Sequence, residues 1–104
     1  MRATKNNILE YLQEIKGELY SEGIVKLGLF GSFARDEQNV YSDIDIAIAK
    51  DKKYLKDKTA YNYFDELTKI KALIKNKFHR NIDIFDLDSD SVMKKHILKD
   101  LHYV

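Results

Sequence analysis

The stretch GLFGSFARDEQNVYSDIDIAIAK, residues 28–50, contains the pattern that decides the fold of this chain. Its last part, residues 43–49, alternates strictly and therefore predicts a β-strand with two different faces. The apolar face consists of Ile44, Ile46 and Ile48, and the opposite face consists of Asp43, Asp45, Ala47 and Ala49. A strand that only filled a core would not carry two aspartates, so the second face needs a chemical explanation.

The segment just upstream predicts a strand, a tight turn and a short helix. Residues 24–30, IVKLGLF, are branched and apolar and predict a buried strand that Gly31 and Ser32 close. Residues 33–37 predict one or two helical turns with Ser32 as the N-cap. Glycine lets a ligand approach the backbone closely, and a helix start offers free N–H groups to a phosphate. The turn is neither a Walker A loop nor a G-x-G-x-x-G loop, and a plain strand–helix turn is the alternative.

Asp43 and Asp45 would project side by side, because residues i and i+2 of a strand lie roughly 6.5–7 Å apart on one face. Two such carboxylates repel each other and resist burial, and a divalent cation bound to both removes this repulsion. Oxygen ligands without a nearby His or Cys suit Mg²⁺, which takes one or two carboxylates together with substrate phosphates. The alternative interpretation is a solvated sheet face with ordinary surface aspartates.

A third aspartate interrupts the isoleucines of NIDIFDL, residues 81–87, a run that alternates again and predicts a third strand. If this strand pairs beside the strand of residues 43–49, Asp83 would approach the two aspartates there. Asp86 would point to the opposite face by alternation, and a strand-end or turn role explains it more simply. We therefore select Asp83 as the third member of the acidic cluster.

The remaining segments complete an α+β pattern of helix, strand, short helix, strand, helix, strand and helix. This order predicts a single domain over residues 1–104, with a small mixed sheet flanked by helices. The other predicted elements are a helix over residues 7–20 with Asn7 as its cap, a charged loop over residues 50–58, a long helix over residues 59–77, a last helix over residues 88–101 and the tail HYV.

The composition excludes several classes of function. The 18 basic and 17 acidic residues give a formal net charge of +1, which does not suit a chain built to coat nucleic acid or an anionic membrane. The chain has no cysteine, which excludes disulfides, thiolate catalysis and cysteine-based zinc sites. Because there is no long apolar run and no signal peptide pattern, we expect a soluble, cytoplasmic protein without direct nucleic-acid binding.

The combined motif is far more specific than its parts. Gly31-Ser32, ten further residues and then Asp43-Ile44-Asp45 resemble the GS-x10-D-x-D motif of the minimal nucleotidyltransferase (MNT) domain, in the superfamily that includes DNA polymerase β. The stretches GLFGSFARDE, SDIDIAI and NIDIFDLDSDSVMKKHILKD also look like that family, so the resemblance spans nearly the whole chain. Asp36 departs from the pattern, because family members often have glycine after the Ala-Arg pair.

The resemblance implies a nucleotidyltransferase fold and a set of roles for the site residues. Asp43, Asp45 and Asp83 would hold Mg²⁺, with two ions expected, and Asp83 would also help activate the acceptor hydroxyl as general base. Gly31 and Ser32 would contact the β- and γ-phosphates of the nucleotide, for which ATP is the default. The implied reaction is attack of a hydroxyl on the α-phosphorus with loss of pyrophosphate.

The resemblance also implies a partner, because MNT proteins of this size often accompany a HEPN-domain ribonuclease toxin. The expected function is an antitoxin that attaches AMP to a tyrosine of that toxin, in a hetero-oligomer or homo-oligomer. Two other functions stay open: a non-catalytic antitoxin that neutralises its partner by binding, and a small-molecule nucleotidyltransferase with a separate helical subunit. Arg35 could neutralise a phosphate, pair with a partner, or be a surface charge.

Overall fold

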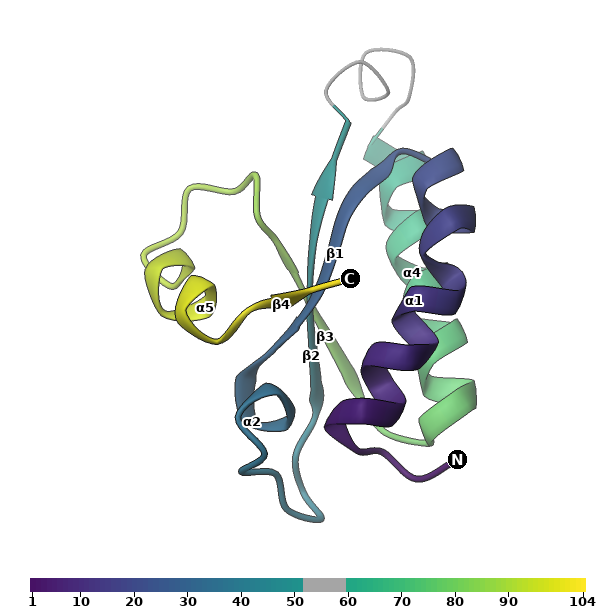
Figure 1. Ribbon diagram of the computed structural model, residues 1–104. Helices are drawn as coiled ribbons and strands as arrows, with labels where there is room; N and C mark the ends of the chain where they lie inside the picture. Colours follow the sequence, from purple (N-terminus) through teal and green to yellow (C-terminus); the bar gives the residue numbers. More distant parts are fainter. Residues whose placement is uncertain (52–59) are drawn as a thin grey trace.

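The computed structural model describes residues 1–51 and 60–104, which build a four-stranded mixed sheet (Figure 1). The strands are β1 (Ile24–Phe30), β2 (Ile44–Lys50), β3 (Ile82–Asp86) and β4 (His102–Tyr103). They lie in the order β3-β2-β1-β4, with β2 and β3 parallel and the other two pairs antiparallel. The predicted α+β class is confirmed, and β2 does pair with β3, the condition under which Asp83 was expected to approach the other aspartates.

The helices lie on both sides of this sheet. Helix α1 (Lys5–Ser21) and helix α4 (Ala60–Phe78) run side by side over one face, whereas α5 (Lys94–Asp100) lies on the other face (Figure 1). Helix α2 (Gly31–Ala34) is a single turn that follows β1 directly. No helix within residues 1–51 and 60–104 is both long and apolar enough to cross a membrane.

The main core lies between the sheet and the helix pair α1 and α4. Ile44, Ile46 and Ile48 of β2 are fully buried there, as their alternation predicts. Burying an isoleucine side chain stabilises a fold by roughly 1.5–3 kcal/mol, so this row contributes strongly to the position of β2. A smaller core on the other face joins Ala47 and Ala49 of β2 to Ile97 of α5.

A bulge in β1 adjusts its alternation to the main core. The pairing with β2 shifts between Ile24 and Lys26, which leaves Val25 as an extra residue. Ile24, Leu27 and Leu29 consequently all join the main core, although strict alternation would place Ile24 on the face opposite Leu27.

The structure corrects two predictions about helix starts. The cap of α1 is Thr4, whose Oγ1 accepts a hydrogen bond of 3.1 Å from the Asn7 N–H, so Asn7 already lies inside the helix. Helix α5 begins only at Lys94 instead of at residue 88. Asp86 holds the preceding turn, because its side chain and carbonyl accept bonds from Asp88 N (2.8 Å) and Ser89 Oγ (2.7 Å).

The tail HYV forms β4 and pairs with the free edge of β1, with Gly28 opposite Tyr103 and Leu29 opposite His102. A run this short carries no readable alternation, so a fourth strand was not predicted from the sequence. Of the predicted charged loop, Lys50 belongs to β2 and Asp51 follows it, and residues 52–58 lie outside the described residues.

Candidate active site

Two aspartates meet across neighbouring strands at one end of the sheet. Asp45 of β2 pairs in register with Asp83 of β3, and aligned residues of parallel strands project from the same face. Asp43 lies just before β2, two residues ahead of Asp45, and its charge acts on the Asp45 carboxyl. This face is opposite to the main core, and there Asp83 is exposed whereas Asp45 is partly buried; Asp43, just before the strand, is exposed.

Gly31 brings the end of β1 against this acidic group. It has φ +77°, and a Cβ added to it would lie 2.1 Å from Asp45 Oδ2 and 2.9 Å from Asp45 Cγ. A side chain at position 31 would therefore collide with the carboxylate and strain the backbone. The turn predicted to approach a phosphate thus lies directly against one of the aspartates predicted to bind the metal.

The expected N-cap role of Ser32 is not what the structure shows. Helix α2 already begins at Gly31, with Phe30 at the cap position and no side-chain cap bond, so Ser32 lies within the first turn. A surface hollow of about 160 Å³ opens beside this turn. It is lined by Phe30, Gly31, Arg35, Met93, Ile97 and Asp100, together with His96.

The pKa of Asp45 is raised to about 6, first because the carboxyl is partly buried and then because Asp83 and Asp43 are close to it. The charge of Arg35 acts in the opposite direction but does not cancel these effects. The site therefore holds negative charge at a cost, which a bound cation would relieve.

The donor set fits a magnesium ion in its chemistry. Asp45 and Asp83 share one face of β2 and β3, Asp43 lies just before β2, and oxygen donors are the ligands that Mg²⁺ prefers. As the side chains stand, no group of three His, Asp or Glu residues in the described ranges could hold a metal. The roles of Asp43, Asp45 and Asp83 as ligands therefore stay predictions.

A family model described as polymerase beta, nucleotidyltransferase, matches residues 6–104 of the chain. The chain belongs to this nucleotidyltransferase family. A relative from Methanocaldococcus jannaschii, MJ0126, named as a candidate protein adenylyltransferase, is 36% identical over 106 residues. The alignment covers 97% of this chain and 98% of that protein. The resemblance seen in the sequence is thereby confirmed.

Two solved structures show the same fold as this nucleotidyltransferase. A candidate minimal nucleotidyltransferase superposes with a TM-score of 0.71 at 17% identity, covering 96% of this chain and 95% of that chain. A toxin–antitoxin structure with AMP-PNP gives a TM-score of 0.59 at 20% identity, covering 97% of this chain and 72% of that chain. At these identities the likeness concerns the fold, and it confirms the predicted nucleotidyltransferase architecture.

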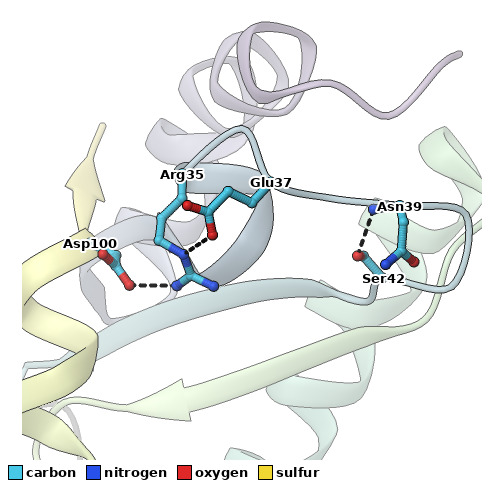
Figure 2. Close-up of polar contacts among 5 residues, drawn as sticks. All are labelled: Arg35, Glu37, Asn39, Ser42 and Asp100. Carbon is cyan, nitrogen blue, oxygen red and sulfur yellow. Dashed lines mark hydrogen bonds and ion pairs between the residues drawn. The ribbon is translucent and has the colours of Figure 1, made fainter.

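Arg35 of the nucleotidyltransferase links α2 to α5. Its Nε lies 3.0 Å from Glu37 Oε2, and its Nη1 lies 2.7 Å from Asp100 Oδ2 (Figure 2). The side chain is 42% exposed, so neither ion pair is buried. From the sequence, Arg35 could neutralise a phosphate, pair with a partner or be a surface charge. The sequence did not indicate Asp100 as its acidic partner.

Asp36, the departure from the family pattern, has φ +57°, a left-handed conformation that glycine adopts without strain. The turn after α2 therefore keeps the shape that the family's glycine would favour, with an aspartate in its place. Aspartate is among the few non-glycine residues that visit this region regularly.

Asp86 stands apart from the acidic cluster, as its alternation predicts. Its Oδ2 lies 2.6 Å from Lys50 Nζ and accepts a 2.8 Å hydrogen bond from the Tyr63 hydroxyl. Burial raises the pKa of Asp86, but the hydrogen bond from Lys50 and those from Asp88 N–H and Tyr63 outweigh it, so the net pKa is lowered. This aspartate is a structural anion between β2, β3 and α4.

Arg80 is the residue near the site that sequence reasoning missed. It lies between α4 and β3, and its guanidinium contacts the loop that leads to Asp43. A surface hollow of about 330 Å³, lined in part by Lys75, His79 and Asp43, lies against the same loop. The only sequence signal is a basic residue three positions before Asp83, which does not by itself indicate where the side chain goes.

Proposed function

We propose that this nucleotidyltransferase is a Mg²⁺-dependent protein adenylyltransferase that moves AMP from ATP to a tyrosine hydroxyl of a partner protein. We further propose that the partner is a HEPN-type ribonuclease toxin and that the modification makes the chain its antitoxin. Family membership and the name of the relative MJ0126 support the activity. The toxin–antitoxin structure with AMP-PNP among the fold neighbours supports the partner and the nucleotide.

The observation that carries the proposal is the meeting of Gly31, Asp45 and Asp83. The backbone of Gly31 lies against the Asp45 carboxylate, and Asp45 pairs with Asp83 across β2 and β3. The turn at Gly31 and two carboxylates from different strands thus share one corner of the sheet. This is the arrangement needed to hold a triphosphate beside an acceptor hydroxyl.

The roles follow from this placement. Gly31 and Ser32 would receive the β- and γ-phosphates, and Asp43, Asp45 and Asp83 would hold Mg²⁺. When bound, the metal would stabilise the negative charge of the triphosphate and the negative charge that develops on the leaving pyrophosphate. The acceptor oxygen forms a bond to the α-phosphorus as the bond to pyrophosphate breaks, and Asp83 takes the hydroxyl proton.

The proposal is tested by incubating the protein with a HEPN partner, Mg²⁺ and ATP labelled in the α-phosphate. Label should appear on a tyrosine of the partner, and Asp43→Asn or Asp45→Asn should reduce the rate by about a hundredfold or more, the scale for losing one preorganised charge contact. Asp90→Asn is the control, because Asp90 is exposed and lies outside the site.

Two results would contradict the proposed activity: no transfer by the unaltered chain, or equal transfer by the Asp43 and Asp45 variants. Neutralisation of the toxin by the double variant would instead indicate an antitoxin that acts by binding. Label on a small molecule in the absence of the partner would indicate a small-molecule nucleotidyltransferase.

A further inference from the structure

Arg80 holds the backbone of the loop that delivers Asp43 to the sheet. Its Nη1 donates to the carbonyl oxygens of Ser42 (2.9 Å), Asn39 (3.2 Å) and Val40 (3.4 Å). The bond to Ser42, the residue directly before Asp43, is the shortest. The bond to Ser42 is partly buried and so competes less with water, whereas the bonds to Asn39 and Val40 are exposed.

The loop is closed on itself, but its own bonds do not attach it to the sheet. Ser42 N–H donates to Asn39 O (3.1 Å), and Asn39 N–H donates to Ser42 Oγ (3.0 Å), a bond that Figure 2 shows. Tyr41 N–H donates to Asn39 Oδ1 (2.8 Å). These contacts give the loop a fixed shape, and Arg80 ties that shape to the start of β3.

The residues on both sides of Asp43 are held by two consecutive residues before β3, Arg80 and Asn81. Arg80 binds the carbonyl of Ser42, and Asn81 O accepts a 3.0 Å hydrogen bond from the Ile44 N–H. The backbone on either side of Asp43 is thus fixed to the two residues that lead towards Asp83. Arg80 therefore holds the backbone on one side of Asp43, and Asn81 holds it on the other.

The Arg80 guanidinium also contacts the helix that contains Gly31 and Ser32. Its central carbon lies 5.2 Å from the centroid of the Phe33 ring, which is fully buried and directly follows Ser32. A planar guanidinium can stack on an aromatic face while its edge donates hydrogen bonds. Arg80 thereby joins three separate segments that carry predicted site residues.

We propose that Arg80 is a positioning residue for adenylyl transfer, which sets Asp43 relative to Asp83 and the Gly31–Ser32 turn. This inference rests on the proposed function, but the order of the loop can be measured without any activity. Two substitutions separate the properties of this side chain. Arg80→Lys keeps the positive charge but loses the planar guanidinium, and Arg80→Met keeps only an apolar side chain.

The first measurement compares amide hydrogen exchange in the unaltered chain, Arg80→Met, Arg80→Lys and the control Arg2→Met. The Arg2 side chain makes no hydrogen bond or ion pair within the described part of the chain, although Arg2 lies near Asn39. We expect exchange at Ser42 and Tyr41 to accelerate by about tenfold or more in Arg80→Met, with Ile48 in the sheet centre unchanged. Arg80→Lys should be intermediate and Arg2→Met unchanged.

The second measurement is the rate of AMP transfer, taken well below the melting temperature of each variant. A displaced Asp43 should lower kcat by about ten- to a hundredfold in Arg80→Met, since small misplacements of a reacting group have effects of this size. The KM for ATP should change less, and Arg80→Lys should restore part of kcat.

Unchanged exchange at Ser42 and Tyr41 in Arg80→Met would overturn the inference, as would equal kcat values for all four proteins. Equal losses in Arg80→Lys and Arg80→Met that merely follow their melting temperatures would also overturn it, because they would indicate a general structural role. If the unaltered chain transfers no AMP, the proposed function fails, whereas the exchange result still decides whether Arg80 orders the loop.

Discussion

At the scale of single residues, Gly31 is a position that leaves no room for a side chain. It combines a left-handed φ of +77° with close contact to the Asp45 carboxylate. The first feature disfavours any other residue, and the second leaves no space for even a methyl group. Geometry at one glycine thus links the end of β1 to the acidic face of β2.

We predict that Gly31→Ala destabilises the fold and abolishes nucleotidyl transfer. The left-handed conformation alone costs roughly 1–2 kcal/mol for a residue with a Cβ, and displacement of Asp45 adds to it. Urea unfolding measures the loss of stability, and the labelled-ATP assay measures the loss of transfer.

The matched control is Gly17→Ala in α1, where an added Cβ meets nothing within 4 Å. This change should stabilise the protein by roughly 0.5–1 kcal/mol, because alanine is the better helix former. If the two substitutions had the same effect, the contact between Gly31 and Asp45 would not be a structural constraint.

At the scale of elements, β1 is the strand on which the site is built. It pairs with β2 on one side and with β4 on the other, and it ends at the turn that carries Gly31. Gly28 lies at its crowded edge, where an added Cβ would lie 2.7 Å from Leu101 Cδ1 and 2.8 Å from the His102 carbonyl oxygen. The short β4 fits against β1 only because this position has no side chain.

We predict that Gly28→Ala pushes β4 away and destabilises the protein by about 1–3 kcal/mol, the usual cost of overpacking. The expected local effect is faster hydrogen exchange at the Val104 amide, which donates a 2.9 Å hydrogen bond to Leu27 O. Hydrogen exchange followed residue by residue provides the measurement. Retained protection at Val104 together with unchanged stability would show that β4 tolerates the extra methyl group.

At the scale of the whole molecule, the two faces of the sheet contribute oppositely to stability. The face under α1 and α4 buries the isoleucines of β2, whereas the other face carries Asp45 and Asp83, with the charge of Asp43 acting on Asp45. The pKa of Asp45 rises to about 6 through burial and through Asp83 and Asp43, so its charged form is less favourable in the folded state than in the unfolded chain. The acidic site is therefore maintained by the core on the opposite face.

We predict that Asp45→Asn stabilises the metal-free protein at pH 7 while it removes activity. Between about pH 4 and pH 6 the folded protein keeps a proton on Asp45 that the unfolded chain has lost, so stability from this group falls as pH rises. At pH 7 the variant avoids this penalty, which we put at about 1 kcal/mol because the carboxyl is partly solvated. Near pH 4 the two proteins should differ little.

Asp86→Asn is the control of opposite sign, on the same pair of strands. Its pKa is lowered on balance, so its charge stabilises the fold at neutral pH, and that contribution is lost as pH falls through the folded-state pKa. The substitution should therefore destabilise the protein at pH 7. Melting temperatures of both variants across pH 4–7 give the comparison, and a pH-independent gain for Asp45→Asn would contradict the explanation.

The sequence by itself determined which side chains share a face. The alternation of residues 43–49 and 81–87 placed the isoleucines in the core and separated Asp83 from Asp86, because side chains alternate between the two faces wherever a strand has no bulge. The glycine–serine turn and its spacing to the aspartates likewise indicated the family, which the match over residues 6–104 confirms.

Only the tertiary structure decided which of these faces and turns come together. The register of Asp45 with Asp83, the contact of Gly31 with Asp45, and the place of β4 depend on pairing between distant segments. The direction of the Arg80 side chain depends on the same long-range packing, because its partners lie about forty residues away in the chain. Local sequence records the period of a strand, but it does not record the neighbour against which that strand will lie.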